Sequence, residues 1–176
     1  MSWKNESLAR LFSPKSIAVI GASDKPEKLG ALALLALNTY GGKVYPINPR
    51  LKMLGDLKCY PKIQDVDDRV DMAMIAVGPH HVIPAISDCA EANIGGAIIF
   101  SSGFKELGGI GIEHQKKLLE IVDDAHIAVI GPNCLGAGNP KIGMNATFFP
   151  HPVSMKGGTV AMVSQSGGVT GLMLYR

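Results

Sequence analysis

The stretch S-I-A-V-I-G-A-S-D-K-P-E-K-L-G, residues 16–30, decides the fold of this chain. Residues 17–20 are a short apolar run rich in β-branched side chains, typical of a strand buried on both faces of a parallel sheet. Gly21 ends the run, because a residue without a Cβ lets the backbone turn sharply or approach a ligand. The apolar segment 29–37 is predicted to be a helix. Strand, glycine turn and helix start together predict a phosphate cradle, through free backbone N–H groups and a positive dipole end.

The glycine turn departs from the dinucleotide-binding pattern G-x-G-x-x-G. Ser23 and Pro26 stand where that pattern has its second and third glycines. On its own, the stretch is therefore also compatible with a first βα turn that binds nothing.

Apolar runs recur along the chain at the spacing of a βα repeat. Predicted central strands start near residues 17, 43, 72, 96 and 127. Predicted helices cover residues 3–12, 29–37, 82–93 and 112–124, and a short edge strand is expected at 57–60. The interval between strands accommodates a crossover helix and two loops. The pattern predicts an α/β fold, a Rossmann-like doubly wound parallel sheet with right-handed crossovers.

The pattern changes after residue 131. Prolines at 132, 140, 150 and 152 fall within about two dozen residues, so no regular element is predicted there. Residues 159–163 are then predicted to form another buried strand, followed by S-Q-S-G-G and an apolar run. We therefore predict a first domain over 1–140 and a linker over 141–157. Residues 158–176 are predicted to be the first strand and helix of a second, incomplete α/β domain.

The composition is that of a soluble globular chain, with 47% apolar residues, 18% charged residues and a net charge of +2 over 176 residues. So small a charge, without a Lys/Arg cluster, argues against a nucleic-acid partner. The longest unbroken apolar run, 31–37, is far shorter than the roughly 18 residues of a membrane span. Three cysteines without C-x-x-C spacing argue against disulfides or a zinc site and favour the cytoplasm.

Neither a metal site nor a catalytic residue is predicted. His80 and His81 are adjacent, so on a helix they point to different faces and make a poor metal pair. His114, His126 and His151 are isolated in the sequence and are interpreted as structural. The ends of the predicted strands supply no acid–base pair.

In a doubly wound sheet the ligand lies at the carboxyl ends of the strands, where the chain reverses direction across the sheet. The candidate binding residues therefore follow the first four predicted strands: Gly21, Ala22, Ser23 and Lys25; Asn48 and Arg50; Val77, Gly78 and Pro79; Ser101, Ser102 and Gly103. Small residues and hydroxyl groups at these ends leave room for a flat ligand across the sheet edge.

The end of the second strand is the most informative position. An NAD-binding domain needs an acidic residue there to accept hydrogen bonds from the ribose, and this chain has Asn48-Pro49-Arg50. A cation suits a phosphorylated ribose. A carboxylate about 4 Å from a phosphate would cost roughly 4 kcal/mol per charge pair at an effective dielectric constant of 20. Either NADP or coenzyme A satisfies this preference.

Six blocks of sequence, in order, carry a family resemblance. They are Ser13 to Ser23, Tyr45 to Pro49, Ser102 to Glu106, Gly131 to Gly136, Asn145 to Phe148 and Ser164 to Gly168. In these blocks the chain resembles the NDP-forming acyl-CoA synthetases, which include the ADP-forming acetyl-CoA synthetases and the alpha subunit of succinyl-CoA synthetase. The resemblance runs from about Leu11 to the last residue.

The resemblance implies a CoA-binding domain followed by the start of a flavodoxin-like ligase domain. It places the first turn and the Asn-Pro-Arg loop at the nucleotide part of CoA, and the loops after the third and fourth strands along the cofactor. The family's usual Val-Pro after the third strand is here Val77-Gly78-Pro79. The resemblance also implies that Asn133, Cys134, Ser166 and Gly167 lie near a phosphorylated histidine, where a helix start suits a phosphate.

The family interconverts acyl-CoA, ADP and phosphate with the free acid, CoA and ATP, through an acyl phosphate and a phosphohistidine. In the family that histidine lies beyond the position of Arg176, and ATP, ADP and Mg bind to an ATP-grasp domain on another segment or subunit. The resemblance thus implies CoA as cofactor, and the remaining ligase and ATP-grasp domains as partners in an oligomeric assembly. The chain alone is expected to be inactive.

Two alternatives stay open. One is an NADP-dependent oxidoreductase or redox-sensing Rossmann domain, against which the missing G-x-G-x-x-G pattern counts. The other is the regulatory CoA-binding module of a protein acetyltransferase. The acyl substrate and the choice between ADP and GDP are not encoded in these residues.

Overall fold

The computed structural model describes residues 2–149 and 157–174. Pro150, His151 and Pro152, most of the second half of the predicted linker, and the last two residues of the predicted second domain lie outside the described residues.

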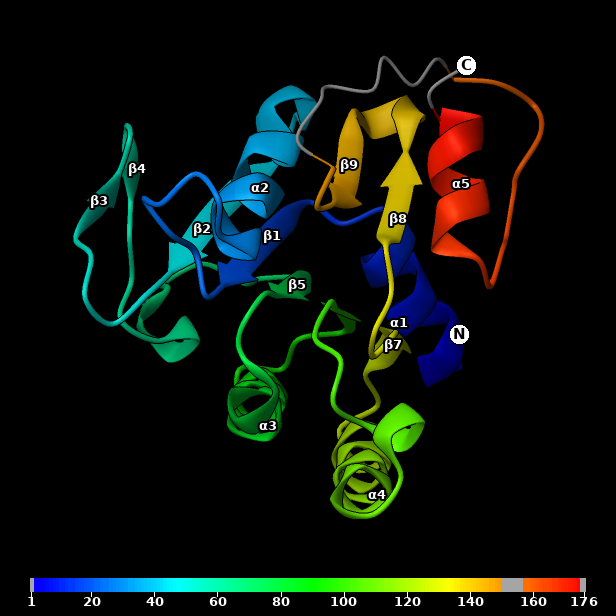
Figure 1. Ribbon diagram of the computed structural model, residues 1–176. Helices are drawn as coiled ribbons and strands as arrows, with labels where there is room; N and C mark the ends of the chain where they lie inside the picture. The colour runs from blue at the N-terminus through cyan, green and yellow to red at the C-terminus, as the bar shows by residue number, and fades with distance from the viewer. Residues whose placement is uncertain (1, 150–156, 175–176) are drawn as a thin grey trace.

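Five parallel strands form the central sheet, in the order β2-β1-β5-β6-β7 (Figure 1). They are β1 (Ser16–Ile20), β2 (Lys43–Ile47), β5 (Met72–Ile75), β6 (Gly96–Ile99) and β7 (Ala128–Ile130). After β2 the chain returns past β1 and continues on its other side, so the direction reverses between β1 and β5. The predicted doubly wound parallel sheet is confirmed, and each central strand starts within one residue of its predicted position.

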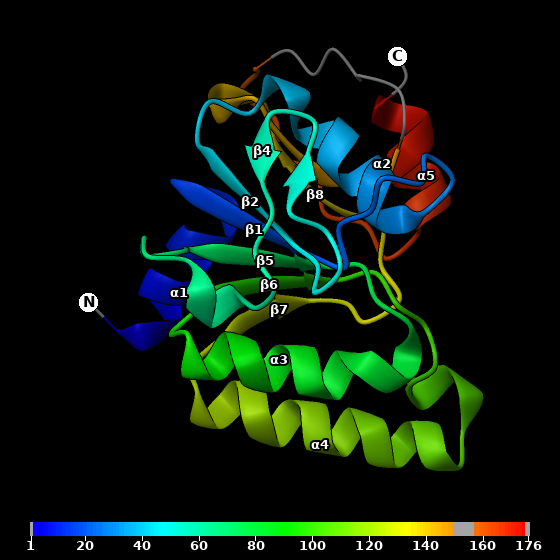
Figure 2. The ribbon, with the colours of Figure 1, turned by 90° about the vertical axis from the view of Figure 1, so that its left-hand side faces the viewer.

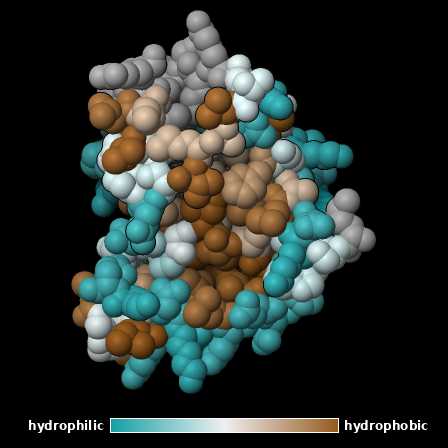
Figure 3. Space-filling view, turned by 90° about the vertical axis from the view of Figure 1, so that its right-hand side faces the viewer, coloured by the Kyte–Doolittle hydropathy of each residue, from teal (hydrophilic) through white to brown (hydrophobic). Residues whose placement is uncertain are grey.

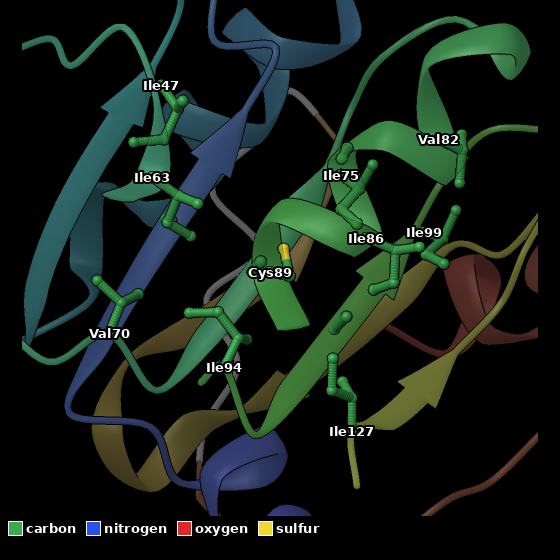
Figure 4. Close-up of a cluster of buried hydrophobic side chains, with 14 of the residues drawn as sticks. Ile47, Ile63, Val70, Ile75, Val82, Ile86, Cys89, Ile94, Ile99 and Ile127 are labelled. Atoms are coloured by element: carbon green, nitrogen blue, oxygen red, sulfur yellow. The ribbon is translucent and has the colours of Figure 1, made fainter. Parts of the chain in front are cut away.

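Helices cover both faces of the sheet (Figure 2). One face carries α1 (Trp3–Phe12) and α2 (Leu29–Ala36), and the other carries α3 (Val82–Glu91) and α4 (Ile110–Asp124). Successive side chains of a strand point to opposite faces. Met72 and Met74 accordingly join the core on the α1–α2 side, whereas Ile75 packs with Ile86 of α3 (Figure 4). Burial on both faces explains the β-branched runs by which the strands are predicted.

An antiparallel hairpin, β8 (Gly136–Asn139) and β9 (Met144–Thr147), lies where the proline-rich stretch predicted no regular element. That prediction is wrong because Pro140 starts the short 3₁₀ turn 140–142 between the strands, where a missing N–H breaks no ladder. Met144 and Ala146 are buried in the core on the α1–α2 side. The hairpin thus completes the cover of this face. It spans residue 140, which was the predicted end of the first domain. The division into domains stays a prediction.

The predicted strand at 159–163 is not formed in this structure. Val160 is 90% exposed and Val163 is fully exposed, and the described residues offer this segment no strand with which to pair. An isolated strand leaves its backbone groups to water, so the apolar pattern alone does not form one. A helix does follow, α5 (Gly167–Leu174), and its Gly171 lies against the ring of Phe149.

The predicted edge strand at 57–60 is divided. β4 (Leu57–Lys58) pairs with β3 (Met53–Leu54) in a small hairpin outside the main sheet, and Tyr60 forms a single bridge with Ile47 beside β2.

Within residues 2–149 and 157–174, every helix is too short or too polar to cross a lipid bilayer.

Met144 tests whether the hairpin is part of the core. We expect Met144→Ala to lower the free energy of unfolding by about 2–5 kcal/mol, because the side chain is fully buried and its loss leaves a cavity. Met53→Ala is the matched control, because Met53 is 54% exposed and its truncation should change stability by less than about 0.5 kcal/mol. Urea unfolding followed by circular dichroism measures both; equal midpoints for the two variants would show that β9 is not a core element.

Candidate cofactor-binding cleft

A cleft of about 750 Å³ opens at the carboxyl ends of β1, β2, β5 and β6, beside the point where the chain reverses direction. The structure brings all but one of the predicted cofactor-binding residues to its walls: Gly21, Ala22, Ser23, Lys25, Asn48, Arg50, Val77, Gly78, Pro79, Ser101 and Ser102. The exception is Gly103. It lies behind Pro79, and its N–H donates to the Glu106 carboxylate at 2.7 Å, which lowers the pKa of Glu106.

The glycine turn after β1 is tightly held. Gly21 has a φ of +86°, and a Cβ at this position would lie 2.6 Å from the carbonyl oxygen of Ala76. The N–H groups of Gly21 and Ala22 both donate to the carbonyl of Ile47, at 3.0 and 3.3 Å. These two N–H groups are therefore already bonded and do not contribute to the predicted phosphate cradle, whereas the N–H groups of Ser23 and Asp24 in the same turn have no acceptor among the described residues.

Further free N–H groups lie at the start of α2. Among the described residues, no acceptor is found for the N–H groups of Leu29 and Gly30, and the first turn of α2 has no acidic residue. Lys25 and Lys28 are exposed at the same wall of the cleft, and Arg50 lies on the wall after β2. Two free amides, a positive helix end and three cations make this part of the cleft suitable for phosphate groups.

Hydrogen bonds between neighbouring strand tips fix the rim of the cleft. The Asn48 side chain lies between the glycine turn and Arg50, and donates to the carbonyl of Ala22 at 2.7 Å. The hydroxyl of Ser101, which is buried, donates to the carbonyl of Val77. The carbonyl of Ser101 in turn accepts the N–H of Asn133 at 2.9 Å. The tips of β1 and β2, of β5 and β6, and of β6 and β7 are thus joined in pairs.

Sequence analysis missed several residues of the cleft, namely Asp24, Lys28, Leu29, Gly30, Leu51, Ala76 and Phe100. Gly30 is the most informative of them, because a Cβ there would lie 1.9 Å from the carbonyl oxygen of Gly21. It permits the close approach of helix and turn that the third glycine of the dinucleotide pattern provides. The available signal was a glycine in the first turn of a predicted helix, displaced from its expected position at Pro26.

The residues predicted near a phosphohistidine form a group outside the cleft. Gly167 begins α5 close to Leu135, so the start of this helix lies beside the loop 131–136 that contains Asn133 and Cys134. The hydroxyl of Ser166 accepts the N–H of Val169 at 3.3 Å. Burial raises the pKa of Cys134 to about 11, so its thiol is protonated at neutral pH. Within the described ranges, no group of three or more His, Cys, Asp or Glu could hold a metal ion.

Residues 15–140 match the family model described as "CoA binding domain". The chain belongs to this family. Its curated relatives include acetate–CoA ligase [ADP-forming] II of Archaeoglobus fulgidus, 42% identical over 95% of this chain and 25% of that protein. They also include the alpha subunit of acetate–CoA ligase [ADP-forming] II of Pyrococcus furiosus, 39% identical over 94% of this chain and 36% of that subunit.

A solved structure of a related enzyme has the same fold. It is acetyl-coenzyme A synthetase 1 of Ca. Korarchaeum cryptofilum, described as dinucleotide forming and in complex with phosphate and ADP. It is 42% identical to this chain, with a TM-score of 0.88 over 96% of this chain and 36% of that one. The chain therefore spans between a quarter and about a third of the length of these relatives.

Gly30→Ala tests the close approach of α2 to the glycine turn. Alanine has the higher helix propensity by about 1 kcal/mol, yet we expect the variant to lose roughly 1–3 kcal/mol of unfolding free energy, because the new methyl group overlaps the Gly21 carbonyl. Gly41→Ala is the control, since nothing lies within 4 Å of its Cβ position. Thermal unfolding of both variants measures the difference; a Gly30→Ala protein as stable as wild type would contradict the contact.

Cys134 is expected to react slowly with a thiol reagent such as DTNB. With a pKa of about 11, only about one thiol in a thousand is ionised at pH 8. Because burial raises the pKa, the rate should rise about tenfold per pH unit until the pH reaches that value. Cys89→Ala/Cys59→Ala protein isolates the signal, and full reaction in guanidinium is the control. Rapid reaction of the folded protein at pH 7 would show an activated thiolate instead.

Proposed function

We propose that this chain is the CoA-binding part of an ADP-forming acyl-CoA synthetase, an enzyme that converts an acyl-CoA, ADP and phosphate into the acid, CoA and ATP. The observation that carries the proposal is the composition of the cleft. Lys25, Lys28 and Arg50 lie at its walls together with the free amides of α2, at the reversal point of a sheet whose family is named for CoA binding.

The cleft fits the chemistry of coenzyme A. CoA carries three phosphate groups on an adenosine and a long thiol-bearing arm, so it needs cations at one end and a narrow, uncharged path at the other. Lys25, Lys28 and the start of α2 would hold the diphosphate, and Arg50 the ribose phosphate. The small residues Gly78 and Ser102 leave room for the arm along the tips of β5 and β6. Its volume is within the usual range for cofactor sites.

The chain's own residues would bind and orient CoA, and its thiol supplies the acyl-accepting group. The cations would hold the phosphate end, and the bonded strand tips would direct the arm towards the loop 131–136. Among the described residues, Asp24 is the one acidic residue that lines the cleft, and the loop 131–136 has none. We propose that the transfer steps need the remaining ligase and ATP-grasp domains, in an oligomeric cytoplasmic enzyme. The three cysteines are free thiols, as a reducing compartment allows.

One face of the molecule supports a second domain as partner. Figure 3 shows apolar side chains gathered in a hollow on the side of α1, β8 and α5. Both helices carry exposed apolar side chains, Leu8 and Phe12 on α1 and Leu172 and Met173 on α5. Exposed apolar surface of this kind marks an interaction site. We propose that a second α/β domain covers this face, and that residues 159–163 become its first strand when they gain strands with which to pair.

Calorimetric titration with CoA tests the function. Wild-type protein is expected to bind, and Arg50→Glu to weaken binding at least about tenfold, roughly 1.4 kcal/mol, because a carboxylate then faces a phosphate. Lys117→Glu makes the same charge change on α4, outside the cleft, and should leave the affinity unchanged. Added salt should weaken the wild-type complex.

Two results would count against the proposal. Equal affinity of Arg50→Glu and wild type would remove the phosphate role of Arg50. Tight binding of NADPH without binding of CoA would favour a Rossmann oxidoreductase in its place.

A further inference from the structure

Asn48 stands at the end of β2, where an NAD-binding domain has the acidic residue that holds the ribose. In this structure the side chain is half-buried, and both ends of its amide are bonded to the protein. Its Nδ2 donates to the carbonyl of Ala22 at 2.7 Å, and its Oδ1 accepts the N–H of Arg50 at 2.8 Å. A donor meets a carbonyl and an acceptor meets an N–H, so the two partners fix the orientation of the amide.

The backbone of Asn48 is also held in place, by contacts with residues 59 and 60. Its N–H donates to the carbonyl of Tyr60 at 2.9 Å, and its carbonyl lies 3.8 Å from the Sγ of Cys59, which is buried. The side chain therefore extends from a fixed point. It connects the glycine turn on one wall of the cleft with Arg50 on the other wall.

We propose that Asn48 is a positioning residue of the cleft, which holds Arg50 and the glycine turn in their binding geometry and does not itself bind the cofactor. This inference rests on the proposed function, because it assigns the contact with phosphate to Arg50. It also separates Asn48 from the other residues of the Asn-Pro-Arg loop, to which the family resemblance gives a common role.

The energetic reason is pre-organisation. Arg50 is exposed, and a loop that is free before binding must be ordered when the ligand arrives, which reduces affinity. The bond from Asn48 to the N–H of Arg50 orders the start of this loop beforehand. The bond to Ala22 keeps the turn, and with it the start of α2, at a constant distance from Arg50.

A double-mutant cycle tests whether Asn48 acts through Arg50. We expect Asn48→Ala to weaken CoA binding about tenfold in the wild-type background and less than about threefold in the Arg50→Ala background, because the residue it positions is then absent. A residue that contacts CoA directly would give the same loss in both backgrounds, and that result would overturn the proposal. Unchanged affinity of Asn48→Ala would overturn it as well.

Asn139 offers a matched control at the opposite end of the sheet. Its Nδ2 donates to the carbonyl of Phe12 at 2.8 Å and its Oδ1 accepts the N–H of Lys141 at 3.1 Å, the same paired pattern. Asn139→Ala thus removes the same two types of hydrogen bond outside the cleft, together with a longer one from Nδ2 to the Ser13 hydroxyl at 3.3 Å. It should lower stability to a similar extent as Asn48→Ala and leave CoA affinity unchanged; a matching loss of affinity would mean that Asn48 acts only through stability.

Hydrogen exchange of the ligand-free protein separates this inference from the proposed function. In Asn48→Ala the amide of Arg50 should exchange about tenfold faster than in wild type, whereas Asn139→Ala should not change it. If wild-type protein fails to bind CoA, the proposed function is wrong, and this measurement still decides the inference. Equal exchange at Arg50 in wild type and Asn48→Ala would overturn it.

Discussion

The carbonyl of Ile47, at the end of β2, accepts the N–H groups of both residues that turn the chain after β1. This shared acceptor brings the tips of the two strands together and forces the backbone at Gly21 into a conformation that a side chain would not permit. α2 then descends onto the turn at Gly30, where only a hydrogen atom fits. The floor of the cleft, the direction of α2 and the position of its free amides all depend on this one bifurcated contact.

As a consequence of that arrangement, some groups of the cleft shape it and others are available to bind a ligand. Two N–H groups of the turn are bonded to the end of β2, the side chain of Asn48 is bonded to the turn, and that of Ser101 is bonded to the carbonyl of Val77, so these groups shape the cleft. The groups that remain available are the N–H groups of Ser23 and Asp24, the start of α2 and the exposed cations, and these are the groups that attract phosphate. The architecture therefore keeps neutral, internally bonded groups at the strand tips and places charge on the loops beside them.

The central sheet and most residues of the cleft could be predicted from the sequence, because both follow from local patterns of apolar residues and glycines. The apolar run before Gly21 needs no distant information to be recognised as a buried strand, and in a doubly wound sheet the strand ends must converge. The hairpin β8–β9 was missed because Gly136-Ala137-Gly138-Asn139 has little strand propensity and is stabilised by tertiary contacts. Residues 159–163 show the converse, since an apolar pattern forms a strand only beside another strand, and none lies beside them among the described residues. The loss of the turn amides to Ile47 and the role of Gly30 depend on contacts between segments far apart in the chain, which no local pattern reports.

The β8–β9 hairpin also bears on the order in which parts of the chain fold. The amide of Asn139 is bonded to the carbonyl of Phe12, 127 positions earlier, and the carbonyl of Gly143 accepts the hydroxyl of Thr39, 104 positions earlier. Contacts that close such long loops form late and slow the search for the native state. On the ribosome, the opening helix and the βα units can collapse as they emerge, but the part of the sheet face that α1 and α2 leave open stays uncovered until β9 has left the exit tunnel. Translation of the hairpin is thus the event that ends the exposure of this core.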